Sequence, residues 1–206
     1  MAREFDTPIL LPGAPTAPLH AATKDYADRQ AAWQWYPSDH GLLTWTFDPL
    51  FTDSAAGVQP GGNGWLFQMA VKLPVSALVS GVAHGVRTAG ATLTSGQNLV
   101  GLFDSNNTRV GVSSDQTTAW ASTGFKQAAL TAAVTLPAGV YYVLFLANGT
   151  TRPTWTSGRA DDAAANYGRT AINWRTACNT TAAATAMPTA RPTPNANSTP
   201  IWCGLY

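Results

Sequence analysis

Hydrophobic and polar residues alternate along most of the chain from residue 41 onward, which is the pattern of β-strands with one buried face. In the run 65–72 every second residue is Trp, Phe, Met or Val, while Gln68 and Lys72 fall on the opposite face. The same pattern predicts further strands at 78–88, 98–103, 109–113, 128–135 and 139–147.

The segments between these runs are rich in turn-forming residues. Residues 60–64 read Pro-Gly-Gly-Asn-Gly, and residues 104–108 read Asp-Ser-Asn-Asn-Thr between two predicted strands, which indicates a hairpin. The run 139–147 is apolar on both faces, so we expect a central strand that is buried on both sides. Short, frequent strands without a helical period predict a mainly β domain over residues 37–156, an antiparallel β-sandwich that is jelly-roll-like.

Residues 1–36 follow a different pattern. Four of the first 18 residues are proline, which favours an extended strap. A helical period follows over residues 19–33, and it predicts a short helix. The apolar stripe of this helix consists of Leu19, Ala22, Tyr26 and Trp33. The stripe is too short for a stable coiled coil by itself, so the helix either docks on its own domain or packs against copies of itself as an attachment and trimerisation segment.

Residues 157–206 are rich in Ala, Thr and Pro, and the four prolines between 188 and 200 imply extended backbone. The segment also carries large apolar side chains that are unusual in a mobile tail, namely Trp174, Ile201, Trp202, Leu205 and Tyr206. We therefore expect an irregular C-terminal segment that packs on the sandwich or on a neighbouring subunit.

The composition disfavours several classes of function. Only 11% of the 206 residues are charged, and the net charge is +1, so no electrostatic field favours nucleic acid as a partner. No apolar run approaches the roughly 20 residues that cross a bilayer, and we expect no membrane insertion. The first 20 residues lack the apolar region of a secretory signal, so synthesis in a cytosol is expected.

The sequence carries none of the common catalytic motifs. A Gly-x-Ser-x-Gly elbow, a phosphate-binding loop and the His-x-His or Cys-x-x-Cys spacing of a metal site do not occur. His84 lies in a predicted strand, where we expect a half-buried structural role. A glycosidase pair would have to come from aspartates such as Asp161 and Asp162, whose turn-like context gives Asp a local structural role. We expect no enzymatic activity, no metal and no cofactor.

The two cysteines, Cys178 and Cys203, allow two interpretations. A disulfide between them would close one loop near the C-terminus and contribute about 3 kcal/mol. A cytosolic origin favours two reduced thiols instead.

Tryptophan is the one feature that suggests a ligand. Trp120 and Trp155 fall in predicted loops, and an exposed indole can stack on the C–H face of a sugar ring. They are therefore candidates for glycan contact, and the alternative is that they fill the core or a subunit interface.

Residues 11–28 read LPGAPTAPLHAATKDYAD. This stretch resembles a short N-terminal motif of bacteriophage tail fibres and other virion appendage proteins, roughly Leu-Pro-x-x-Pro-Thr-x-x-x-x-Ala-Ala-Thr-Lys-x-Tyr-Val-Asp. Ala27 stands where the motif usually has Val. Residues 93–151 also look like β-sandwich modules of actinobacterial phages, through the runs 98–104 and 138–151.

The resemblance implies a structural protein of a tailed-phage virion, made in the cytoplasm of the host bacterium. It would be a small tail fibre or minor tail protein and a homotrimer, with residues 1–36 near its attachment end. Its partners would be copies of itself, other phage tail or capsid proteins, and glycans of the host surface. Two alternatives remain, a head-fibre or decoration protein of the capsid and a stand-alone carbohydrate-binding module.

Overall fold

The computed structural model describes residues 35–158 and 164–206. Its contacts divide the chain into two compact units, Met1–Tyr36 and Pro37–Tyr206. The predicted stripe of Leu19, Ala22, Tyr26 and Trp33 lies outside the described residues. The fold described below is that of the second unit, which we call the body.

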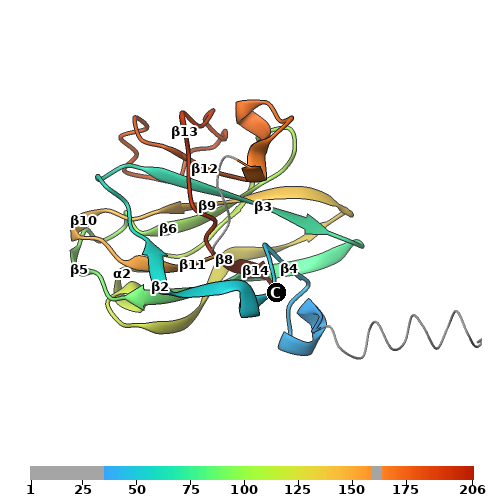
Figure 1. Cartoon of the computed structure of the whole chain (residues 1–206), viewed down its shortest axis with the longest axis horizontal. Coiled ribbons are helices and arrows are strands. Elements are labelled where there is room, and N and C mark those ends of the chain that lie inside the picture. Colours follow the sequence, from blue (N-terminus) through green and yellow to red (C-terminus); the bar gives the residue numbers. More distant parts are fainter. Residues whose placement is uncertain (1–34, 159–163) are drawn as a thin grey trace, which may run out of the picture. The chain divides into compact units, whose positions relative to one another are not determined.

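The body is built mainly of antiparallel strands in two large sheets (Figure 1). The strands of the first sheet are β1 (Thr44–Trp45), β2 (Thr52–Val58), β4 (Ala77–Thr88), β8 (Gly124–Leu136), β11 (Thr154–Gly158) and β14 (Cys203–Leu205). Their order is β1-β14-β4-β11-β2, and β8 also pairs with β4.

The second sheet has the order β13-β12-β3-β9-β6-β7. Its strands are β3 (Leu66–Leu73), β6 (Leu99–Phe103), β7 (Arg109–Val112), β9 (Gly139–Leu146), β12 (Thr176–Asn179) and β13 (Ala196–Asn197). A separate two-stranded ribbon joins β5 (Ala91–Leu93) to β10 (Gly149–Thr151). The helical turns are short: η1 (Pro37–His40), η2 (Pro49–Phe51), α2 (Thr117–Trp120), η3 (Ala164–Asn166) and η4 (Ala171–Asn173).

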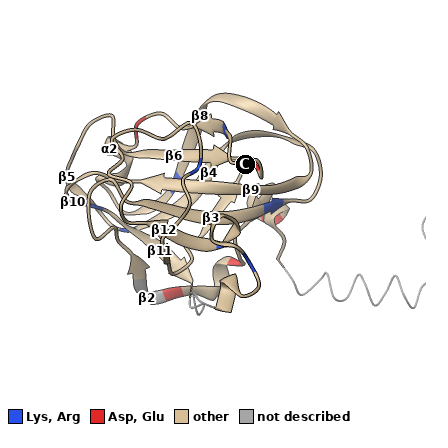
Figure 2. Ribbon diagram, turned by 90° about the horizontal axis from the view of Figure 1, so that it is seen from above, with Lys and Arg blue, Asp and Glu red and all other residues tan. Residues whose placement is uncertain are grey.

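The two large sheets form the layers of a β-sandwich, which Figures 1 and 2 show from two directions. Val82 and Val86 of β4 and Phe67 and Val143 of the second sheet are buried in one hydrophobic cluster. Burial of such side chains is the main force that holds the sheets together. The mainly β, antiparallel sandwich is therefore confirmed, whereas its jelly-roll-like connectivity stays a prediction.

The strands predicted from alternating polarity are all present, with ends shifted by a few residues. β9 is the clearest case, because it lies between β3 and β6 and its residues from Tyr141 to Leu146 are buried. This confirms the expectation of a central strand that is buried on both faces. The strands that the pattern missed are short or irregular, such as β2 and β14.

The structure corrects the predicted boundary between 37–156 and 157–206, because the body extends without a division from Pro37 to Tyr206. β12 and β13 add two strands to the second sheet, and β14 lies between β1 and β4 in the first. β14 pairs with the backbone of β4. Without β14, the N–H and C=O groups along that edge of β4 would have no partner strand. The C-terminal segment therefore supplies strands to both sheets, and Cys178, Ile201 and Leu205 lie in the main core.

Candidate functional site

Trp120 and Trp155, the candidates for glycan contact, lie in the core. Both side chains are 0% exposed. Their ring centroids are 5.4 Å apart in an edge-on arrangement, and Trp155 also lies 5.2 Å from the ring of Phe145. The prediction of glycan contact at these two residues is wrong, because α2 and β11 turn the indoles into the space between the sheets, where no sugar reaches them.

His84 belongs to the same aromatic cluster and is fully buried, further than the half-buried position expected. Its Nε2 accepts a hydrogen bond of 2.8 Å from the indole Nε1–H of Trp120. The acceptor role of Nε2 places the proton of the neutral ring on Nδ1. Burial lowers the pKa of His84 to about 4, so the ring is neutral at pH 7 and its role is structural.

Cys178 and Cys203 are thiols and are not joined by a disulfide. Cys178 lies in β12 of the second sheet and Cys203 in β14 of the first. Burial raises the pKa of the Cys203 thiol far above its usual range, which makes it a poor nucleophile. Of the two interpretations of this pair, the structure bears out the reduced one.

A catalytic or metal centre does not emerge from the part of the chain that is described. Within 35–158 and 164–206, no three His, Cys, Asp or Glu side chains come together in a way that could hold a metal ion. Figure 2 shows charged residues few and scattered over the ribbon. The candidate pair Asp161 and Asp162 lies outside the described residues. No helix in those two ranges is long and apolar enough to cross a membrane.

Arg191 is a buried polar anchor that the sequence analysis missed. Its guanidinium donates hydrogen bonds to Gln68 Oε1 (2.7 Å), to Asn107 Oδ1 (2.5 Å) and to the carbonyl oxygen of Ile172. Its Cζ lies 3.6 Å from the centroid of the Tyr142 ring, as in a cation–π contact. Burial lowers the pKa of this guanidinium. These contacts of the Arg191 guanidinium join the C-terminal segment to the second sheet. The partners are distant in the sequence, so only the three-dimensional structure shows that they meet.

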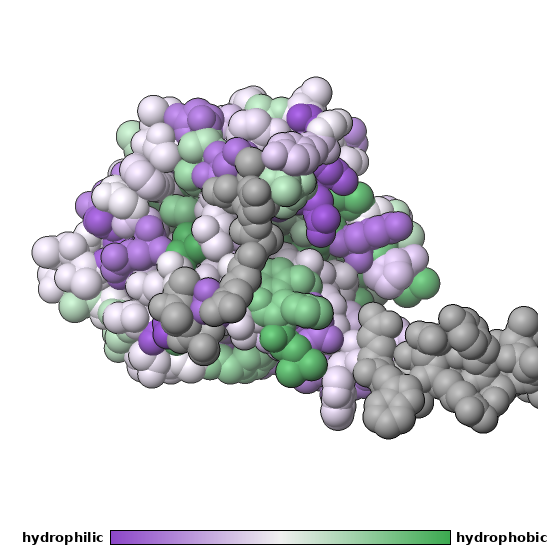
Figure 3. Space-filling model, in the orientation of Figure 1, coloured by the Kyte–Doolittle hydropathy of each residue, from purple (hydrophilic) through white to green (hydrophobic). Residues whose placement is uncertain are grey.

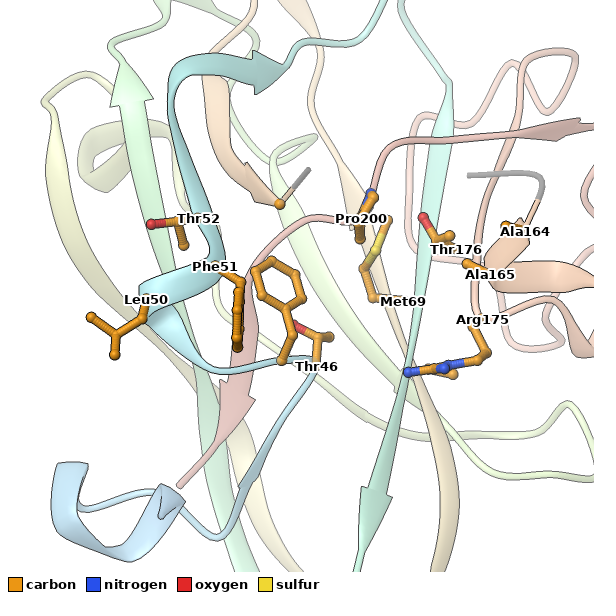
Figure 4. Close-up of a pocket in the computed structure, with 13 residues that line it drawn as sticks. Thr46, Leu50, Phe51, Thr52, Met69, Ala164, Ala165, Arg175, Thr176 and Pro200 are labelled. Atoms are coloured by element: carbon orange, nitrogen blue, oxygen red, sulfur yellow. The ribbon is translucent and has the colours of Figure 1, made fainter. Parts of the chain in front are cut away.

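One surface hollow is a pocket of about 760 Å³ where β1, η2 and β2 approach β3 and β12. In Figure 4, Leu50, Phe51 and Thr46 lie on one side of it and Arg175 and Thr176 on the other. Leu50 and Phe51 are 78% and 70% exposed, so they give the pocket an apolar rim. Figure 3 shows green, hydrophobic areas on the face of the molecule seen in Figure 1. Gly158 and Ala164 also line the pocket, and the residues that join them are not described.

The second hollow, of about 480 Å³, is bounded entirely by described residues and lies on the outer face of the first sheet. We call it the outer groove. The residues that line it are His40, Leu42, Pro49, Thr52, Gly85, Val86, Gly124, Phe125, Thr156 and Trp202. They come from η1, η2, the four strands β2, β4, β8 and β11, and the residues just before β1 and β14, and no alternation pattern predicted that they would meet.

Comparisons with protein-family models, with curated proteins and with solved structures found no match to the chain.

Proposed function

We propose that this chain is a non-enzymatic structural protein of a tailed-phage virion, a small tail fibre or minor tail protein. Residues 1–36 form the attachment and trimerisation segment, and Pro37–Tyr206 forms the body that is carried outward. One observation supports this division above all. The phage-like motif at 11–28 falls wholly within the compact unit Met1–Tyr36, which ends at the residue where the sequence predicts the attachment segment to end.

The construction of the body supports a binding or spacer role. Among the described residues, its main hydrophobic cluster includes side chains from Leu43 to Leu205. A stripe of Leu19, Ala22, Tyr26 and Trp33 would be buried if three copies met around an axis. Trimerisation and folding of the body are then separate properties of one chain.

Light scattering on the purified full-length chain tests this proposal. The expected mass is three times 21.7 kDa, and the chain that begins at Pro37 is expected to be a folded monomer. Tyr26→Asp places a charge in the stripe and should convert the trimer to monomers. Tyr167→Asp is the matched control, because Tyr167 is 76% exposed on the body, and it should leave the trimer intact.

A full-length monomer, or a trimer that persists without residues 1–36, would contradict the trimerisation role. Imaging of virions that carry a labelled copy of the chain then gives its position. Label on the tail supports the fibre or minor tail protein, and label on the capsid supports the head-fibre or decoration protein. Absence of the chain from virions would overturn the proposal as a whole.

A further inference from the structure

The outer groove combines two glycines, Gly85 and Gly124, with an aromatic wall. Gly85 of β4 lies directly across from Phe125 of β8. A Cβ atom on Gly85 would lie 2.3 Å from Thr156 Oγ1, and one on Gly124 would meet no atom within 4 Å. The space over Gly85 is therefore occupied by Thr156, whereas the space at Gly124 is open, next to Phe125, whose side chain is 58% exposed.

The wall of the groove combines aromatic rings with hydroxyl groups. The Phe125 ring lies 6.2 Å from the ring of Trp202, at a tilt of 48°. Thr52 and Thr156 lie on the same hollow. Thr52 Oγ1 donates to the carbonyl oxygen of Pro49 (2.8 Å), which leaves its lone pairs as acceptors. A ligand that fits this wall needs an apolar face as well as hydroxyl groups.

The charge of the lining narrows the class of ligand. None of the ten residues that line the groove is Asp, Glu, Lys or Arg, and His40 is the only one of the ten whose side chain can carry a charge, so the lining offers little to neutralise a phosphate, a carboxylate or an ammonium group. Trp202 is 7% exposed and its indole N–H is buried, so this residue offers the groove its ring and not its N–H. A neutral ligand suits such a lining, because a charge taken out of water there would have little to pair with.

We infer that the outer groove binds one or two rings of a neutral saccharide, with the C–H face of one pyranose stacked on Phe125. A sugar ring has the required apolar face and hydroxyl edge, and about 480 Å³ lies within the usual range of small-ligand sites. The inference rests on the proposed function only for the source of the sugar, which is then a glycan of the host surface. It replaces the buried pair Trp120 and Trp155 as the glycan-contact site.

The test uses the full-length chain and named probes: maltotriose, cellotriose, mannotriose and lactose, with glucuronic acid as a charged comparison. Saturation-transfer NMR detects binding, and titration gives the Kd. At least one neutral probe should bind, with glucuronic acid weaker. Phe125→Ala should weaken that binding at least about tenfold. Trp202→Phe retains an aromatic ring beside Phe125 and should weaken binding less.

Phe51→Ala is the matched control, because Phe51 is 70% exposed and lines the other pocket instead of the outer groove. It should bind the probe like the wild type, and circular dichroism checks that each variant is folded. The inference is overturned if no neutral probe binds the wild type. It is also overturned if Phe125→Ala binds unchanged, or if Phe51→Ala loses as much affinity.

Light scattering separates this inference from the proposed function. If the chain is a trimer and binds none of the sugars, the sugar site is refuted and the virion role is unaffected. If the chain is a monomer and binds a sugar through Phe125, the sugar site is supported and the trimerisation role is contradicted. A third result, in which Phe125→Ala lowers the oligomeric mass and no sugar binds, would make the groove a subunit interface and overturn the inference.

Discussion

At the scale of single residues, the body is organised around a buried hydrogen bond between two ring nitrogens. Trp120 donates to His84 Nε2 over 2.8 Å, and both side chains are 0% exposed. The interaction requires a neutral imidazole, because a protonated Nε2 cannot accept. The core of this protein therefore contains a group whose ionisation opposes folding.

His84 makes the stability of the body depend on pH. Its pKa falls from 6.5 to about 4 on folding. Between these two pH values the imidazole is protonated in the unfolded state and neutral in the folded state. The stabilising effect is complete above pH 6.5 and is lost as the pH falls toward 4. The free energy of unfolding should decrease by about 3 kcal/mol across this window from His84 alone, as urea denaturation at several pH values can measure.

The variant His84→Gln removes the titrating group and should flatten the pH dependence of unfolding between pH 6.5 and 4. Equal pH dependence in the wild type and in His84→Gln would show that other groups are responsible.

The sequence predicted a structural His84 on a strand, but not its partner. Trp120 lies 36 residues away on α2, a helix of four residues that is too short to show a period. An exposed loop tryptophan and a buried one look alike in the sequence. For the same reason, Trp120 and Trp155 could be interpreted as sugar-stacking rings until the packing of the sheets was known.

At the scale of elements, the last residues of the chain are structural. β14 is only three residues long, yet all three are buried and pair with Val82, Ala83 and His84. Its other edge holds β1. A strand this short has no measurable alternation, so the sequence showed the apolar side chains near the C-terminus without showing the element that uses them.

Leu205→Ala should destabilise the body strongly. Leu205 is 0% exposed and belongs to the main core, and truncation of a buried leucine costs about 2–5 kcal/mol. Leu50→Ala removes the same atoms from a side chain that is 78% exposed, and should change stability by no more than about 0.5 kcal/mol. Chemical denaturation of both variants checks this, and similar losses would contradict an integral β14.

At the scale of the whole molecule, we expect trimerisation and folding of the body to be separable. If residues 1–36 associate, their unfolding midpoint should rise with protein concentration, because association stabilises by mass action. The transition of the body should not depend on concentration and should keep its midpoint when the chain begins at Pro37. Calorimetry at a low and a high concentration measures both transitions. A concentration-dependent body would contradict the separation.

The sequence by itself determined the class of the fold and most of the long strands. Alternation along 65–72 and 78–88 and the doubly apolar run 139–147 were sufficient, because a strand's side-chain period is a local property of the backbone. The sequence also predicts a boundary after residue 36, where the pattern of the chain changes.

Only the tertiary structure decided which residues meet across the sheets. The outer groove joins η1, η2, β4, β8 and the residues around β11 and β14. Arg191 donates hydrogen bonds to Asn107 and Gln68, which precede it by 84 and 123 positions in the sequence. The burial of Trp120 and Trp155 and the placement of Cys178 and Cys203 in different sheets likewise depend on the tertiary structure. Contacts of this kind depend on sheet order and on the path of irregular segments, which arise from cooperative packing and leave no periodic trace in the chain.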